Sequence, residues 1–301
     1  MTIVAPPVHI FHPIFGQFIG DANDPDLDLP REFLIQVQEF MAFASLLKTS
    51  EPASNPEWRQ LLSKLLDIGI HETQNADGTR SDAISTIDIT TLGESAPLFV
   101  CEYKGILGEG GCDPSIQAGC SMRRAWIRRD RSAMRDKCCC PTFMIAGGGP
   151  WMCILGAVFT DKVVVQRLTD MMWIGLSSTS EEARIHRFAR LMMALRQSFP
   201  KLQDYYEKIS TANIPPFTEG SPHPRFYPYP TSFLESGKLT YFDYVKMLED
   251  HPACVTYLAK IRKDVKSSDV DELVVVKFVH RYGHEVHQFL ADNNHSPKIR
   301  Y

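Results

Sequence analysis

A glutamate and a lysine two residues apart, Glu102 and Lys104, lie at the end of an apolar run that begins at Pro97. The run is rich in strand-forming residues, and side chains alternate between the two faces of a strand, so we expect both charged groups on one face. A buried charge needs a partner. Two interpretations remain open. The pair is a plain salt bridge, or Glu102 binds a divalent cation while Lys104 orients or deprotonates an attacking water.

A second carboxylate, Asp82, lies in the segment from Gly78 to Ile89, which alternates like a strand. The residues from Leu92 to Ala96 are expected to form a turn between this strand and the one that carries Glu102. Two strands joined in this way pair side by side. The order therefore predicts that Asp82 approaches Glu102 and Lys104.

A helix is predicted to begin at Asp113, because aspartate is a favoured N-cap and Pro114 suits the first turn. We expect this helix to continue to Lys137 and to be strongly basic. Its cationic residues are Arg123, Arg124, Arg128, Arg129, Arg131, Arg135 and Lys137. Such a run is either a solvated surface or a site that neutralises phosphates, for which the candidates are Arg123, Arg124, Arg128 and Arg131.

The ordered set of Asp82, Glu102, Lys104 and Gln117 resembles the PD-(D/E)xK, or restriction-endonuclease-like, nuclease fold. The resemblance implies a mixed sheet flanked by helices. It also implies that Asp82 and Glu102 are ligands of Mg²⁺ or Mn²⁺ and that Lys104 positions the water. Gln117 is similar to the helix glutamine of the RecB-like branch, and would orient the substrate or the lysine.

Two positions depart from that pattern. Ser81 precedes Asp82 where a proline is usual, and Ser121 occupies the place of the branch's tyrosine. In this fold a glutamate of the first core helix can join the metal ligands. Glu39 is the candidate, on a helix predicted to open at Leu29–Glu32 and to run to Ala44, and the alternative is a solvated helix charge.

The remaining periodicity predicts an α/β chain. Residues 1–28 show no periodicity and are expected to form a loosely held arm. The other predicted elements are helices at 57–70 and 181–199 and strands at 141–146, 152–159 and 163–168.

A segment dense in proline and aromatic residues, 214–230, precedes strands predicted at 254–259 and 272–279, a helix at 283–290 and a strand at 297–301. This order resembles the small lobe of a protein kinase. Lys277 would then contact nucleotide phosphates and Glu285 would pair with Lys277; the alternative is an ordinary lysine at a strand edge. The sequence has no evident glycine-rich loop, catalytic loop or magnesium-binding motif, so we expect no kinase activity.

Together the two parts resemble basidiomycete fungal proteins that place a domain before a protein-kinase-like domain, a layout shared by some Crinkler-type effectors. The expected organisation is a nuclease-like domain at 1–230 and a partial small lobe at 231–301. The expected function is metal-dependent hydrolysis of nucleic-acid phosphodiesters. The alternative is a catalytically inactive interaction or regulatory domain of a kinase-like or effector protein.

A net charge of −4 means that any affinity for nucleic acid must come from a local patch. No apolar run is long enough to span a bilayer and no secretory signal is evident, so we expect an intracellular protein, cytoplasmic or nuclear, without membrane contact. A protein partner or a homodimer stays open. Cys138–Cys140 are expected to be buried, reduced thiols, with a zinc site as the alternative.

Overall fold

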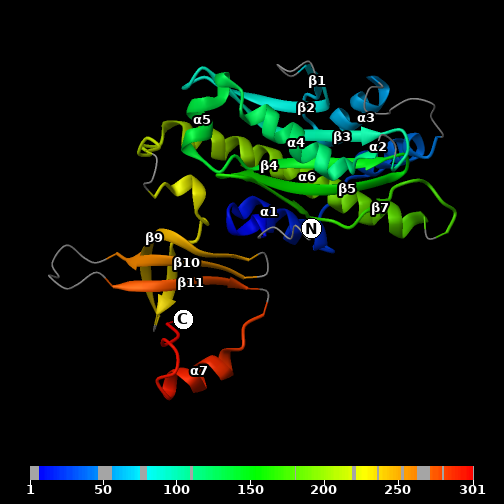
Figure 1. Ribbon diagram of the computed structural model, residues 1–301. Helices are drawn as coiled ribbons and strands as arrows, with labels where there is room; N and C mark the ends of the chain where they lie inside the picture. Colours follow the sequence, from blue (N-terminus) through cyan, green and yellow to red (C-terminus); the bar gives the residue numbers. More distant parts are fainter. Residues whose placement is uncertain are drawn as a thin grey trace.

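Two β-sheets organise the chain in the computed structural model (Figure 1). The structure describes residues 7–46, 56–74, 80–108, 111–179, 181–218, 222–235, 237–251, 254–262, 272–279 and 281–300. The strands of the first sheet are β1 (His71–Gln74), β2 (Arg80–Ile89), β3 (Glu94–Lys104), β4 (Thr142–Gly148), β5 (Trp151–Phe159), β6 (Val163–Arg167) and β7 (Met172–Trp173). The helices are α1 (Pro13–Asn23), α2 (Arg31–Ala44), α3 (Pro56–Leu66), α4 (Pro114–Trp126), α5 (Ser132–Lys137), α6 (Glu181–Thr211) and α7 (His284–Asp292).

The first sheet is mixed, as predicted. Its strand order is β1-β2-β3-β4-β5-β6, and β7 also pairs with β5. Only the β3–β4 pair is parallel among the pairs of the described strands. The turn between β2 and β3 lies at residues 90–93, so that Glu94–Ala96, predicted as part of the turn, belong to β3.

Helices cover both faces of this sheet (Figure 1). Successive residues of a strand point to opposite faces. Glu102 of β3 contacts Ser121 of α4, whereas Tyr103 packs on Trp58 of α3 with ring centroids 4.9 Å apart. Thus α4 covers one face, and α3, with α1 and α6, covers the other.

The expectation of a loose arm at residues 1–28 is wrong for residues 7–23. Residues Val8–Ile10 form a short 3₁₀ helix, η1, and α1 follows. Phe15 and Phe18 of α1 are fully buried, and Phe15 packs edge-on against Phe143 of β4 at 5.2 Å. Gly156 of β5 makes room for it, because a Cβ there would lie 2.6 Å from the Phe15 ring. The short apolar stripe of α1 was hidden by flanking prolines and aspartates.

Three predicted helix lengths also need correction. The helix predicted at 57–70, α3, ends at Leu66. The helix that begins at Asp113 ends at Trp126, and a 3₁₀ turn, η4 (Arg129–Arg131), separates it from α5. Helix α6 runs past its expected end and contains Pro200. Phe199 and Leu202 are both buried in the core, so packing on both sides of the proline stabilises the longer helix.

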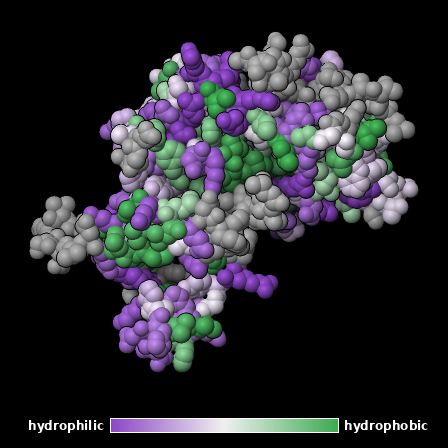
Figure 2. Space-filling view, viewed as in Figure 1, coloured by the Kyte–Doolittle hydropathy of each residue, from purple (hydrophilic) through white to green (hydrophobic). Residues whose placement is uncertain are grey.

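The second sheet has the order β11-β10-β9-β8 and is antiparallel. Its strands are β8 (Ser232–Glu235), β9 (Lys238–His251), β10 (Cys254–Ile261) and β11 (Leu273–Val279). Strands β8 and β9 were not predicted. Residues 297–300, predicted as a strand, are irregular, and residue 301 lies outside the described part. Figure 2 shows apolar surface over β9–β11. Leu273 and Val275 of β11 are exposed apolar residues.

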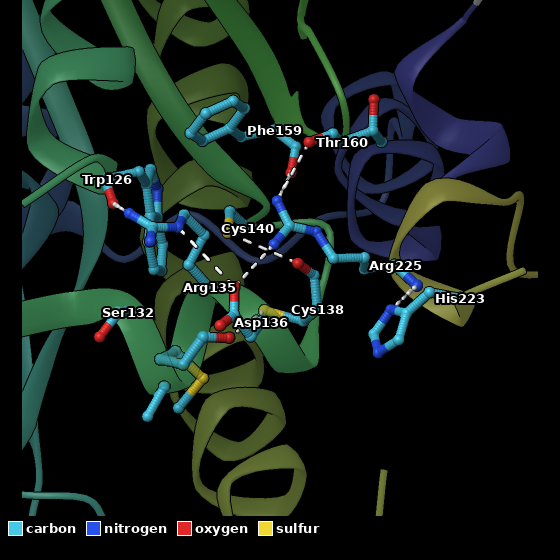
Figure 3. A network of polar contacts seen from close by, with 12 residues as sticks. Trp126, Ser132, Arg135, Asp136, Cys138, Cys140, Phe159, Thr160, His223 and Arg225 are labelled. Carbon is cyan, nitrogen blue, oxygen red and sulfur yellow. Dashed lines mark hydrogen bonds and ion pairs between the residues drawn. The ribbon is translucent and has the colours of Figure 1, made fainter. Parts of the chain in front are cut away.

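An arginine ties the segment between the two sheets to the first one. Arg225 lies in η5 (Pro224–Phe226) and is buried. It forms an ion pair with Asp136 of α5 at 3.1 Å and donates to the carbonyl of Thr160 at 3.0 Å (Figure 3). Phe278 of β11 packs against the cores of both sheets. These contacts position the small sheet beside the large one.

Cys138, Cys139 and Cys140 are buried free thiols, as expected. Burial raises the pKa of the Cys139 and Cys140 thiols. Among the described residues, no group of three or more His, Cys, Asp or Glu side chains is placed to hold a metal ion. None of the described helices combines the length and the apolar character needed to cross a membrane.

Candidate functional site

The candidate site lies at the end of β3, on the face beneath α4. Glu102 has no exposed surface and Lys104 is 9% exposed. Their alternation places both side chains on the same face, as the sequence predicted. In the sheet register Glu102 lies beside Ala146 of β4, and Ala146 lies opposite Cys153 of β5. On the side of β4 and β5, the neighbours of Glu102 in the sheet are therefore small or apolar.

Helix α4 supplies the polar contact to this carboxylate. The Ser121 hydroxyl donates a short hydrogen bond to Oε1 of Glu102. Ser121 is itself buried. Gln117 precedes Ser121 by one helical turn, so both lie on one side of α4, and Gln117 is half-buried there. Ser121, which occupies the place of the tyrosine in the nuclease pattern, is thus the residue that orients Glu102.

Asp82 lies in β2, next to the last paired residue of the β2–β3 ladder. The ladder ends at Ala83 opposite Cys101. One further step of the antiparallel register would place the Asp82 backbone opposite Glu102. The Asp82 side chain lies outside the described residues. Its approach to Glu102 therefore stays a prediction, which the backbone register favours.

The structure does not bring Glu39 to this site. It lies on α2, in the helical layer on the opposite face of the sheet. Its carboxylate pairs with Lys64 of α3 at 3.4 Å, and both side chains are about half exposed. Glu39 is therefore a solvated charge on a helix, which was the alternative interpretation.

The basic residues after α4 do not form one cationic face. Arg131 is buried and donates to the carbonyl of Ala125 at 2.7 Å and to Ser95 Oγ at 3.1 Å. Burial lowers its pKa to about 10. Arg128 forms two hydrogen bonds of 3.0 Å with Asp130. Of the four candidates for phosphate binding, Arg131 is a structural residue.

Arg123 and Arg124 remain at the surface of α4, exposed and half-buried. Two further cations of the run are held by the protein. Arg135 donates to the carbonyl of Trp126 at 3.0 Å, and Lys137 donates to that of Ala212 at 2.6 Å. Arg131, Arg135 and Lys137 therefore bind backbone carbonyls of the protein itself. The spacing of charges in the sequence could not show this.

The two residues of the kinase-like resemblance do not meet. Lys277 is exposed on β11, where it lies opposite Thr256 of β10. Glu285 is exposed in the first turn of α7. The ion pairs of the described residues include none between them. The expected lysine–glutamate pair is absent from this part of the chain.

The start of α4 carries a polar cluster that sequence analysis missed. Asp113 caps the helix by accepting from the Ser115 backbone nitrogen at 2.7 Å. Arg167, at the end of β6, donates to Ser115 Oγ at 3.1 Å and to Asp113 Oδ2 at 3.3 Å. Partial burial opposes ionisation of Asp113, but the Ser115 hydrogen bonds and Arg167 lower its pKa. Only the N-cap pattern of Asp113 was visible in the sequence.

Two exposed tryptophans, Trp151 and Trp173, lie in register with Lys104 across the sheet. Lys104 lies beside Gly148 of β4, which lies opposite Trp151 of β5, and Trp151 lies opposite Trp173 of β7. The two indoles meet edge to face with centroids 5.3 Å apart. Trp151 is 37% and Trp173 43% exposed. Their distance along the chain gave no indication that they meet.

The donor chemistry of the site suits a hard cation better than zinc. Glu102 offers carboxylate oxygen, and Ser121 offers a hydroxyl, whereas the thiol of Cys153 is turned to Ser115 at 3.9 Å. Magnesium prefers oxygen ligands and usually needs more than one carboxylate or phosphate. The β2–β3 register would place Asp82 as the second carboxylate.

No family model matches the chain, and neither a curated protein nor a solved structure matches it.

Proposed function

We propose that the chain is a metal-dependent nuclease of the restriction-endonuclease-like kind, with its site on β2, β3 and α4. The observation that carries the proposal is the burial of Glu102 and Lys104 on one face of β3, with Glu102 held by Ser121 of α4. A carboxylate taken out of water this completely is costly unless charge or hydrogen bonds compensate for it. A divalent cation would supply that compensation.

In this proposal Glu102 and Asp82 hold Mg²⁺ or Mn²⁺. The metal, when bound, stabilises the negative charge that develops on the phosphate. Ser121 keeps one Glu102 oxygen in a fixed direction by its hydrogen bond. Lys104 orients or deprotonates the attacking water. Gln117 orients the substrate or Lys104.

The second candidate is a catalytically inactive interaction or regulatory domain of a kinase-like or effector protein, which keeps the sheet as a scaffold. One observation favours it. Glu102 has no exposed surface, so that a metal and its waters reach the carboxylate only if α4 yields. A buried carboxylate beside a lysine is also how a purely structural pair is built.

Cleavage and metal binding separate the two candidates. The chain is incubated with plasmid, single-stranded DNA and RNA in Mg²⁺ or Mn²⁺, and Mg²⁺ binding is measured by calorimetry. Glu102→Gln is expected to abolish both binding and cleavage, and Asp82→Asn to weaken both. Lys104→Ala is expected to spare metal binding but to slow cleavage by about 10²–10⁴-fold, the usual contribution of a general acid or base.

Glu39→Gln is the matched control. It removes one carboxylate charge from the other side of the sheet and is expected to leave cleavage and metal binding unchanged. Circular dichroism of each variant checks that the fold is kept. A chain that binds no Mg²⁺ through Glu102 and cleaves none of these substrates refutes the nuclease, and the scaffold is then the supported function.

A further inference from the structure

A groove runs along the edge of the first sheet between α1, residues 167–174 and α6. It consists of two adjoining cavities of about 540 and 590 Å³, which share Asp170, Met171, Met172 and Arg187. The first cavity reaches Arg167 and Arg190, and the second reaches Trp173 and Arg184. We call this feature the arginine groove. Its size is that of sites that hold extended small ligands or a stretch of chain.

The charge of the arginine groove is positive. Four arginines line it, against the single carboxylate of Asp170. Arg184 donates to the carbonyl of Gly175 at 3.0 Å. Arg187 and Arg190 take part in no ion pair or side-chain hydrogen bond with the residues that the structure describes. Two guanidinium groups are therefore available for an anion, and guanidinium groups match phosphate geometry.

Its walls carry apolar and aromatic surface beside these charges. Trp173, Met171 and Met172 line the second cavity together with Phe188. The indole of Trp173 is 43% exposed and is braced by Trp151. A ligand that satisfies both features has regularly placed phosphates and flat rings. An unpaired polynucleotide offers both, whereas a duplex hides its rings inside the stack.

The arginine groove lies at an edge of the same sheet, on the side that α1 and α6 cover, whereas Glu102 and Lys104 lie on the side that α4 covers. Lys104 and Trp173 lie in one row across β3, β4, β5 and β7, a span of three strand spacings or about 14 Å between their Cα atoms. At the other end, Arg167 contacts Ser115 at the start of α4. Trp151 and Trp173 thus lie between Lys104 and the arginines of the groove. A strand bound on Trp173, Arg187 and Arg190 would reach the candidate site by crossing this edge of the sheet.

We propose that the arginine groove binds single-stranded nucleic acid, with a base stacked on Trp173 and phosphates on Arg187 and Arg190. The link between the arginine groove and Glu102 rests on the proposed function. The inference specifies that the substrate of the proposed nuclease is a single strand. The net charge of the chain is −4, so the affinity comes from this local concentration of arginine.

The test measures binding without metal, so that cleavage cannot interfere. Labelled single-stranded DNA and RNA oligonucleotides, the matched duplex and a mononucleotide are titrated with the chain in EDTA, and fluorescence anisotropy is recorded at several salt concentrations. Arg187→Gln/Arg190→Gln is expected to weaken single-strand binding about tenfold or more and to reduce the salt slope by about 1.4, since each lost phosphate contact removes about 0.7. Trp173→Ala is expected to weaken it about tenfold to a hundredfold, the usual effect of losing one stacked base.

Matched controls remove equal charge and similar surface elsewhere. Arg31→Gln/Arg281→Gln neutralises two exposed arginines, and Tyr229→Ala truncates an exposed aromatic residue. Both are expected to bind as the unaltered chain does. The inference fails if the unaltered chain does not bind the single strand, or if both Arg187→Gln/Arg190→Gln and Trp173→Ala bind as tightly as their controls. It also fails if duplex or mononucleotide binds as tightly as the strand.

Glu102→Gln separates this inference from the proposed function. It is expected to keep single-strand binding, because Glu102 is not part of the arginine groove. A chain that binds through the groove but does not cleave supports this inference and refutes the nuclease. Glu102-dependent cleavage that is indifferent to Arg187, Arg190 and Trp173 refutes this inference alone.

Discussion

At the scale of single residues, the contact between Ser121 and Glu102 is the one that decides how the candidate site works. In the sequence, Ser121 is notable only because it occupies the place of the tyrosine in the nuclease pattern that the motif resembles. In the folded chain its hydroxyl is buried and donates to the buried carboxylate. The contact joins α4 to β3 and holds one Glu102 oxygen. A substitution at Ser121 should therefore affect stability through Glu102.

Ser121→Ala is expected to lower the free energy of unfolding by about 1.5–3 kcal/mol, the range for a hydrogen bond to a charged group. Urea unfolding measures it. Ser198→Ala is the matched control, because Ser198 is also buried on a helix but donates only to the Ala194 carbonyl of its own helix. That bond is expected to matter much less.

A double-mutant cycle with Glu102→Gln tests whether the effect passes through this pair. The cost of Ser121→Ala should fall in the Glu102→Gln background, because the charged acceptor is gone. Equal costs in both backgrounds would show that Ser121 acts by packing alone.

At the scale of elements, α1 depends on the neutral form of one histidine. His12 is the N-cap of α1, and its Nδ1 accepts from the backbone nitrogen of Ile14 at 3.2 Å. The ring is buried and lies edge to face with Tyr205, with centroids 4.3 Å apart. Burial lowers the pKa of this imidazole from 6.5 to about 4. Protonation would remove the acceptor and place a charge against Tyr205.

The pH dependence follows from this shift. The unfolded chain takes up a proton at His12 near pH 6.5, but the folded chain does so only near pH 4. The stability that His12 contributes is therefore complete above pH 6.5 and is lost as pH falls from 6.5 toward 4. The total loss is expected to be at most about 3 kcal/mol. Urea unfolding across this pH range measures it.

His12→Asn is the control, because asparagine keeps a capping oxygen and does not titrate. The difference in stability between the unaltered chain and this variant should change between pH 6.5 and 4 and stay constant above pH 6.5. A constant difference over the whole range would mean that His12 is solvated and that α1 is not docked as described.

At the scale of the whole molecule, Arg225 holds the connection between the two sheets. Besides its contacts with Asp136 and Thr160, its guanidinium lies 4.9 Å from the centre of the Phe226 ring. The nearby Tyr229 nitrogen donates to the Ile10 carbonyl at 2.9 Å. Opposite ends of the first 230 residues thus meet at this point, and the second sheet begins at Ser232.

Arg225→Met is expected to loosen this connection, because the Thr160 carbonyl loses its donor while the apolar stem is largely replaced. The free energy of unfolding should fall by about 1–3 kcal/mol. Limited proteolysis should cut residues 212–231 faster, since cleavage follows local opening. Fragments are identified by mass spectrometry.

The matched control is Arg31→Met, which removes an exposed arginine from α2. It should leave the rate of cutting at residues 212–231 unchanged. If Arg225→Met also leaves that rate unchanged, the small sheet is held by Phe278 and its neighbours instead of by Arg225.

What the sequence by itself determined is local and periodic. Alternation along β3 placed Glu102 and Lys104 on one face, and the capping preference of Asp113 located the start of α4. Both patterns depend on interactions within a few residues, which the order of amino acids encodes directly. The same reasoning predicted the strands at 141–146, 152–159 and 163–168, which are apolar runs, whereas the mixed pairing of the sheet was what the family resemblance implied.

Only the tertiary structure decided the features that join distant segments. Arg131 is buried because Ser95 and Ala125 lie beside it, and no charge pattern along the chain could separate it from its exposed neighbours. The contact of α1 with Phe143 and the meeting of Trp151 with Trp173 arise in the same way. A contact across the fold depends on how whole elements pack, since the burial of a side chain and the identity of its partners are properties of the assembled core. A segment by itself determines only which backbone conformation it prefers.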